Sequence, residues 1–274
     1  GNMDKAVEIL REKGLAASQK KAGRIAAEGM AYAAVVDGVG VVVEVNAETD
    51  FVGKNEKFVD FVKGVAAVVA KEKPADLDDL MAKPYGNGRT VQEEQQEMVL
   101  VIGENIKVRR FAFFTDGISV PYVHAGGKIG VMVRAESPAG AIPEILAAAK
   151  DCALQVAAMN PPYLKREDVP AAVLDEEKKI ILAQMAEDPK MANKPEQVKE
   201  KIAAGKVGKY YGENCLLEQA FVKENKETVQ SYVDGVAKAA GTTIAITDFV
   251  RFERGEGIEK KADNFAEEIA SMIK

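Results

Sequence analysis

Histidine and cysteine are scarce in this sequence, and their scarcity excludes several kinds of chemistry. Only one histidine, His124, stands among 274 residues, so neither a Ser-His-Asp triad nor a histidine-rich metal site is expected. The two cysteines, Cys152 and Cys215, are far apart and form no Cys-x-x-Cys pair. This spacing predicts no disulfide framework and fits a reducing compartment, where both thiols are typical small core residues.

The sequence also lacks an excess of basic residues and any long apolar run. Its formal net charge is -6, with acids and bases interleaved, which argues against a general nucleic-acid binder. A protein partner that itself binds RNA is still compatible with this charge. No run approaches the length of a membrane span, and no stretch resembles a signal peptide. We therefore expect a cytoplasmic protein that contacts neither nucleic acid nor membrane directly.

Phosphate-binding loops and catalytic pairs are missing as well. No Gly-Lys pair is followed by Ser or Thr, which excludes a Walker A loop. The glycines Gly38 and Gly40 lack the third glycine of a dinucleotide fingerprint and indicate a turn. The many carboxylates lie on helical faces, where solvation is the ordinary explanation. The sequence therefore predicts no enzyme, no cofactor and no metal.

What is present describes an ordinary globular chain of about two domains. Hydrophobic residues make up 47% and charged residues 29% of the sequence. Residues 44–58 form its most informative stretch, because they follow a buried strand at 41–43 and precede a helical pattern. Thr49 and Asn55 are candidate N-caps of that helix, and Asp50 would suit its N-terminus. The apolar positions of the helix are Phe58, Phe61, Val62, Val65, Val68 and Val69.

Phe51 stands in this turn, before the periodic apolar face begins. One interpretation is a hydrophobic staple that folds back onto the helix, and composition alone favours it. The other is a projecting aromatic side chain that anchors a protein partner.

The stretch from Glu44 through Val52 resembles the signature of the elongation factor Ts family, the guanine-nucleotide exchange factors of elongation factor Tu. The family usually has Cys or Ser where Ala47 stands and Ser or Ala where Gly53 stands. The resemblance implies that Asp50 and Phe51 enter the partner's nucleotide domain near its magnesium site, which favours the projecting interpretation. Partner contacts are therefore expected at Thr49, Asp50, Phe51 and Val52.

Further motifs in the same order extend this resemblance from about Asp4 to the C-terminus. They lie at residues 102–106, 109–110, 124–131, 251–253 and 255–260. The resemblance implies that the loop holding His124, Gly126 and Gly127 faces the partner's last domain, although a lone histidine beside two glycines is also typical of a water-satisfied sheet edge.

The tetrapeptide Thr-Asp-Phe-Val occurs a second time, at residues 247–250. There it enters an alternating strand, so Phe249 is expected in a sheet and not at a partner surface. The partner role is therefore assigned to Asp50 and Phe51 alone.

Two halves of the chain share the order hairpin, helix, helix, strand. This repeat predicts an α+β fold of two subdomains, each a small antiparallel sheet with helices on one face. Asp-Gly turns, as at Asp37, mark the hairpins. The expected boundaries are an N-terminal helix and linker at 1–29, core subdomains at 30–117 and 118–255, an inserted helical hairpin at about 165–226, and a C-terminal helix in 256–274.

The N-terminal helix is predicted over residues 4–13, with Gly14 as its stop. Residues 3–15 resemble the last helix of the ubiquitin-associated-type domain that begins the family. Its two preceding helices do not stand in the sequence, so we expect a truncated chain. A scaffold protein with a different partner is the alternative to an exchange factor, because the charged helical pair and acidic surface would also suit that role.

Overall fold

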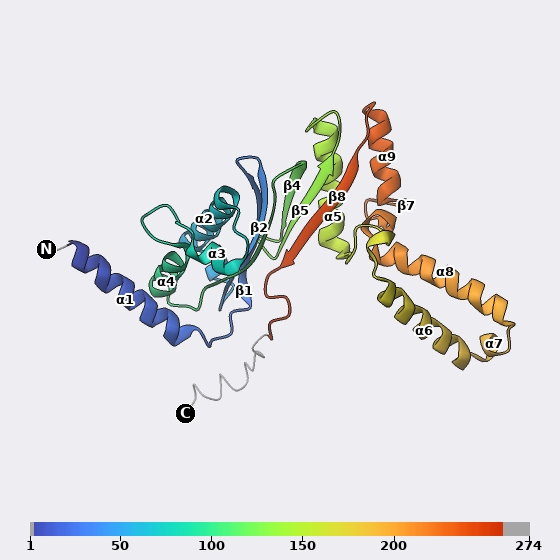
Figure 1. Ribbon diagram of the computed structural model, residues 1–274, viewed down its shortest axis with the longest axis horizontal. Helices are drawn as coiled ribbons and strands as arrows, with labels where there is room; N and C mark the ends of the chain where they lie inside the picture. The colour runs from blue at the N-terminus through green and yellow to red at the C-terminus, as the bar shows by residue number, and fades with distance from the viewer. Residues whose placement is uncertain (1–2, 260–274) are drawn as a thin grey trace. The chain divides into compact units, whose positions relative to one another are not determined.

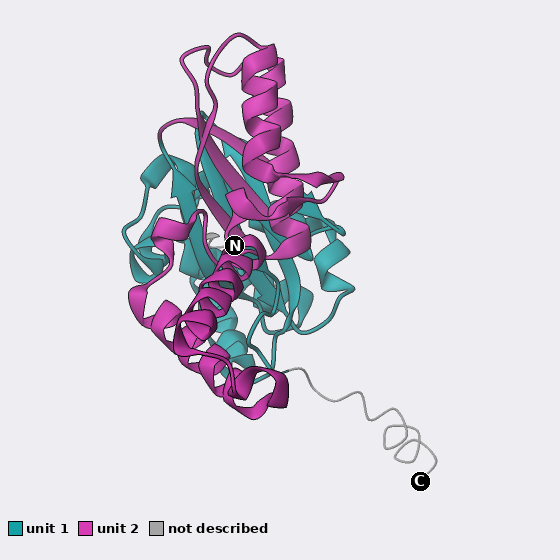
Figure 2. Ribbon diagram, turned by 90° about the vertical axis from the view of Figure 1, so that its right-hand side faces the viewer, with its two compact units in different colours: residues 1–115, 123–130, 252–274 teal, residues 116–122, 131–251 magenta. Residues whose placement is uncertain are grey.

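The computed structural model describes residues 3–259 and shows helices combined with small antiparallel sheets (Figure 1). This confirms the predicted α+β class. The chain divides into two compact units (Figure 2). Unit 1 comprises residues 1–115, 123–130 and 252–274, and unit 2 comprises residues 116–122 and 131–251. The C-terminal helix predicted at residues 264–273 lies outside the described residues.

Unit 1 contains a three-stranded sheet with strand order β1-β2-β3. The strands are β1 (Glu28–Val36), β2 (Val39–Ala47) and β3 (Lys107–Phe114), and both pairings are antiparallel. Asp37 and Gly38 join β1 to β2 with φ angles of 49° and 81°, as the predicted Asp-Gly turn requires. The central strand β2 is buried along its whole length, which explains its nearly continuous run of valine.

In the described part of unit 1, four helices accompany this sheet: α1 (Met3–Lys21), α2 (Glu56–Glu72), α3 (Leu77–Ala82) and α4 (Val91–Ile102). The predicted apolar face of α2 is buried against the sheet, with Phe58 fully inaccessible. Thr90 and Glu93 form the predicted capping box at the start of α4.

The predicted stop at Gly14 is wrong, because α1 continues as one helix to Lys21. Gly14 is buried, and a Cβ atom placed there would lie 3.5 Å from the Gln96 backbone of α4. A close approach of two helices therefore accounts for this glycine, which the local pattern alone read as a C-terminal signal.

Unit 2 holds most of a second sheet, with strand order β4-β5-β8. Its strands are β4 (Ile118–His124), β5 (Ile129–Glu136) and β8 (Ala245–Glu253), and its helices α5 (Pro143–Met159) and α9 (Val229–Ala239) match the predicted ones. The short pair β6 (Ala220–Phe221) and β7 (Glu224–Thr228) was not predicted.

Short 3-10 turns occupy Val52–Lys54 in unit 1 and Arg166–Asp168 and Leu216–Glu218 in unit 2.

A helical hairpin is inserted in unit 2, as expected. It consists of α6 (Ala171–Glu187), the short α7 (Pro189–Ala192) and α8 (Glu196–Asn214), and α6 and α8 run side by side in Figure 1. The predicted start at Arg166 is wrong by five residues, because Pro170 occupies the N-cap of α6. The hairpin's small core comprises Ile181, Met185, Ala203 and Val207.

Candidate partner-binding site

The turn between β2 and α2, residues 48–55, is called here the Phe51 turn. It begins where the fully buried strand β2 ends at Ala47 and runs through the 3-10 turn at Val52–Lys54. It ends at Asn55, whose side-chain oxygen accepts hydrogen bonds from the backbone N–H groups of Lys57 and Phe58. Asn55 is therefore the N-cap of α2, one of the two candidates predicted.

Glu104, just beyond the end of α4, fastens the start of the Phe51 turn. Its Oε2 accepts the backbone N–H of Glu48 at 3.1 Å and that of Thr49 at 3.0 Å. Its Oε1 accepts the hydroxyl of Thr49 at 2.7 Å. The hydroxyl of Thr49 is thus engaged by Glu104, and Thr49 does not cap α2.

Close packing fixes the middle of the Phe51 turn. Val52 is buried, with 7% of its surface exposed, and belongs to the core of unit 1. Gly53 is also buried, and a Cβ atom there would lie 2.9 Å from the carbonyl oxygen of Gly29. A larger residue at 53 would therefore push the turn away from β1.

Phe51 itself is 80% exposed, whereas the other exposed large apolar side chains that the structure describes range from 37% to 51%. Asp50 beside it is also exposed. The hydrophobic-staple interpretation of Phe51 is therefore wrong, because Val52 and not Phe51 turns towards the core.

The surface beside Phe51 is hollowed. A depression of about 570 Å³ lies between the start of α2 and the end of α4, and Val101 on its α4 side is 46% exposed. Its lining residues are Phe51, Val52, Asn55, Glu56, Lys57, Val101 and Ile102. The projecting ring thus borders a partly apolar depression of the kind that a complementary protein surface can fill.

The second predicted contact region is the β4–β5 turn. His124 and Gly126 are exposed, and the backbone carbonyl of His124 accepts hydrogen bonds from Gly127 at 3.2 Å and Lys128 at 3.0 Å. Gly127 is buried instead: its carbonyl accepts the N–H of Ala31 at 2.8 Å, and a Cβ atom there would meet Met30 at 2.6 Å. Gly127 therefore serves the packing of this turn onto β1 within unit 1.

A buried carboxylate that the sequence did not single out, Glu44 of β2, ties this region of unit 1 together. It is 0% exposed and accepts hydrogen bonds from Asn46 at 3.0 Å, Arg109 at 3.0 Å, Arg110 at 2.5 Å and the backbone N–H of Gly255 at 2.8 Å. Burial alone would raise the pKa of Glu44, but these hydrogen bonds outweigh it and lower that pKa from 4.5. Glu44 is therefore an ionised, structural group.

The second Thr-Asp-Phe-Val lies in β8, as predicted. The hydroxyl of Thr247 accepts a hydrogen bond from Arg134 Nε at 3.1 Å. Phe249 is half-buried in the strand. The two copies of the tetrapeptide are therefore different physical objects, one a strand and one a projecting turn.

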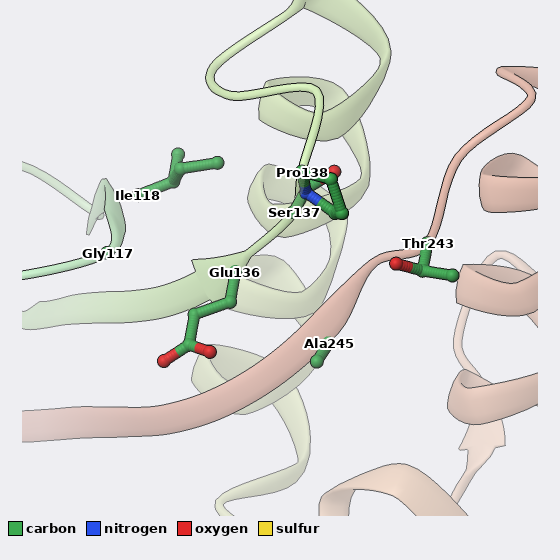
Figure 3. Close-up of a pocket in the computed structure, with 7 residues that line it drawn as sticks. All are labelled: Gly117, Ile118, Glu136, Ser137, Pro138, Thr243 and Ala245. Atoms are coloured by element: carbon green, nitrogen blue, oxygen red, sulfur yellow. The ribbon is translucent and has the colours of Figure 1, made fainter.

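A shallow hollow in unit 2 offers little for small-molecule chemistry. The hollow in Figure 3 has about 480 Å³ and contains one charged side chain, Glu136, whose carboxylate points away from Pro138. Within residues 3–259, no group of three or more His, Cys, Asp or Glu is placed to hold a metal ion. No helix in that range is long and apolar enough to cross a membrane.

Comparisons with known proteins give consistent results. The family described as elongation factor TS matches residues 48–256. A protein of Syntrophotalea carbinolica named elongation factor Ts is 47% identical over 277 residues, covering 100% of this chain and 90% of the relative. Proteins of the same name from Trichlorobacter lovleyi and Clostridium perfringens are 49% and 46% identical, each covering 99% of this chain and 89% of the relative.

Proposed function

This chain belongs to the elongation factor Ts family of translation elongation factors, and on that premise we propose that it promotes the release of GDP from elongation factor Tu in the cytoplasm. In this proposal the chain forms and breaks no covalent bond. It acts by linkage: it binds the partner more tightly when nucleotide and magnesium are absent, so each ligand weakens the binding of the other.

The exposed ring of Phe51 is the observation that carries this proposal. Aromatic side chains are common anchors of protein interfaces, and this one stands on a turn held by hydrogen bonds and buried neighbours. Such a turn loses little freedom on binding, so more of the contact energy can act on the partner.

Of the four predicted contacts, we assign the partner contact to the exposed Asp50 and Phe51, and a supporting role to Thr49 and to the buried Val52. Phe51 inserts into the partner's nucleotide domain, and Asp50 places a negative charge beside it. A magnesium ion that bridges phosphates is a large local charge, so a small displacement of its surroundings weakens nucleotide binding. Val52 and Thr49 hold the turn in place. Val52 is buried in the core, and the hydroxyl of Thr49 is hydrogen-bonded to Glu104.

A second contact is proposed at the β4–β5 turn. His124 and Gly126 are exposed there and are available to the partner's last domain, while Gly127 shapes the turn through its contact with Met30. A grip away from the nucleotide site would keep the chain attached while Phe51 acts.

The direct test is GDP release from elongation factor Tu loaded with a fluorescent GDP. Adding this chain should accelerate GDP release above the baseline rate, because its binding weakens the binding of the nucleotide. Partner without the chain gives the baseline rate. A chain that binds the partner yet leaves the release rate unchanged would be a scaffold, and the proposal would be wrong.

A further inference from the structure

We infer that Glu104 is a positioning residue for nucleotide exchange, acting through the backbone of the Phe51 turn. This inference rests on the proposed function. It concerns a residue 53 positions from Phe51 in the sequence, and none of the contacts assigned above includes it. The link between Glu104 and the turn exists only in the folded chain.

The geometry shows one carboxylate meeting three donors of the turn. Oε2 accepts two successive backbone N–H groups, those of Glu48 and Thr49, and Oε1 accepts the hydroxyl of Thr49. Hydrogen bonds to an ionised acceptor are about twice as strong as neutral ones. Glu104 therefore holds the backbone immediately before Asp50 and Phe51.

A second carboxylate, that of Glu48 in the turn, makes the reciprocal contact with the segment after α4. Glu48 Oε1 accepts the backbone N–H of Asn105 at 2.6 Å, so the turn and the segment after α4 each hold the other's backbone. Gly103 permits this arrangement, because its φ of 86° turns the chain sharply at the end of α4. The hydrogen bonds of Glu104 and Glu48 thus hold the backbone just beyond Ala47, where the strand pairing of β2 ends.

Loss of Glu104 would free the backbone N–H groups of Glu48 and Thr49 and the hydroxyl of Thr49. The Glu48 side chain would still hold Asn105, and Val52 and the cap at Asn55 would still anchor the far end of the turn. Phe51 would remain exposed but would sample more orientations, and that freedom must be lost when the ring inserts. The expected effect therefore falls on the maximum rate of GDP release and not on attachment through the β4–β5 turn.

The test compares Glu104→Ala, Glu104→Gln and a matched control, Glu93→Ala. Glu93 is also a carboxylate that accepts a backbone N–H, that of Thr90 at 2.8 Å, but it stands at the opposite end of α4. Each variant is titrated against elongation factor Tu loaded with fluorescent GDP, and a thermal melt is recorded for each.

Glu104→Ala should lower the maximum release rate by at least about fivefold, with the half-saturating concentration changed less than about twofold, because three hydrogen bonds to the turn are lost. Glu104→Gln should release GDP within about twofold of the unmodified rate, since its amide can accept the backbone donors and donate to Thr49. Glu93→Ala should lower the melting temperature and leave the maximum rate unchanged.

A double variant separates positioning from general damage. In a Phe51→Ala background, Glu104→Ala should slow release by less than about twofold, because the ring it positions is gone. If Glu104→Ala alone retains the unmodified rate, or if the two effects multiply in full, the inference is wrong and the proposed function stands.

Failure of the proposed function has a different signature. If the unmodified chain does not accelerate GDP release, or if Phe51→Ala releases GDP as fast as the unmodified chain, the proposed function fails and the inference with it.

Should Glu104→Ala not fold, Thr49→Val decides, since it removes the Thr49–Glu104 hydrogen bond with little change of shape. An unmodified rate in Thr49→Val would then overturn the inference, and a slower maximum rate would support it.

Discussion

Replacing Phe51 with alanine should hardly change the stability of the fold. A phenylalanine side chain can bury about 200 Å². Because Phe51 is 80% exposed, only about one fifth of that area is covered. At about 25 cal/mol per Å², the roughly 40 Å² lost corresponds to about 1 kcal/mol of unfolding free energy at most.

Phe58, seven residues later, is the matched control. It is 0% exposed in the core of unit 1, so Phe58→Ala should cost about 3–5 kcal/mol through lost burial and the cavity left behind. Urea unfolding of both variants and the unmodified chain, followed by circular dichroism, measures the two changes side by side.

The comparison would refute the reasoning if Phe51→Ala lost as much stability as Phe58→Ala. That result would place the ring of Phe51 inside its own protein in solution. A small change for Phe51 together with a large one for Phe58 would confirm that the two rings have opposite environments.

Two further predictions concern polar groups. Glu44→Gln should cost about 3 kcal/mol at pH 7, because Arg109 and Arg110, 26% and 31% exposed, lose a fully buried partner. The folded-state pKa of Glu44 is lowered from 4.5, so its contribution to the free energy of unfolding is complete above that pH and is lost as the pH falls below it. In urea unfolding, the difference in unfolding free energy between Glu44→Gln and the unmodified chain should therefore narrow below pH 4.5. A difference that stays constant with pH would contradict this. Asn55→Ala should lower the unfolding free energy by about 1 kcal/mol, whereas Asn55→Asp should keep most of it, and equal losses in both would exclude the capping role.

Much of the fold was predictable from periodicity and turn residues. The continuous valines of β2 identified a strand that is buried on both faces, and the helical spacing of apolar residues in α2 identified a helix that is buried on one face. The Asp-Gly turn and the Thr90–Glu93 capping box were equally clear, since each satisfies its own backbone within a few residues.

Features that depend on distant contacts were not predictable in this way. Gly14 carries the local signal of a helix end, yet α4 packs closely against it and α1 continues. Gly127 was recognisable as a turn residue, but only the folded chain shows that Met30 leaves no room for a side chain there.

The candidate site shows the same limit. Composition alone favoured a packed Phe51, and this was wrong because the answer depends on which of two neighbours, Phe51 or Val52, turns inward. Glu104 was visible only as part of a motif at residues 102–106, with no spacing to connect it to Thr49. Glu44 reads as one polar residue within an apolar strand, and its arginine partners lie 65 and 66 positions away.

The measurement that tests the account most directly is the rate of GDP release from elongation factor Tu with Phe51→Ala at saturating concentration. The account predicts a natively folded variant that binds the partner but releases GDP at least about tenfold more slowly than the unmodified chain, a difference of about 1.4 kcal/mol. Release at the unmodified rate by a folded Phe51→Ala would contradict the claim that this exposed ring drives exchange.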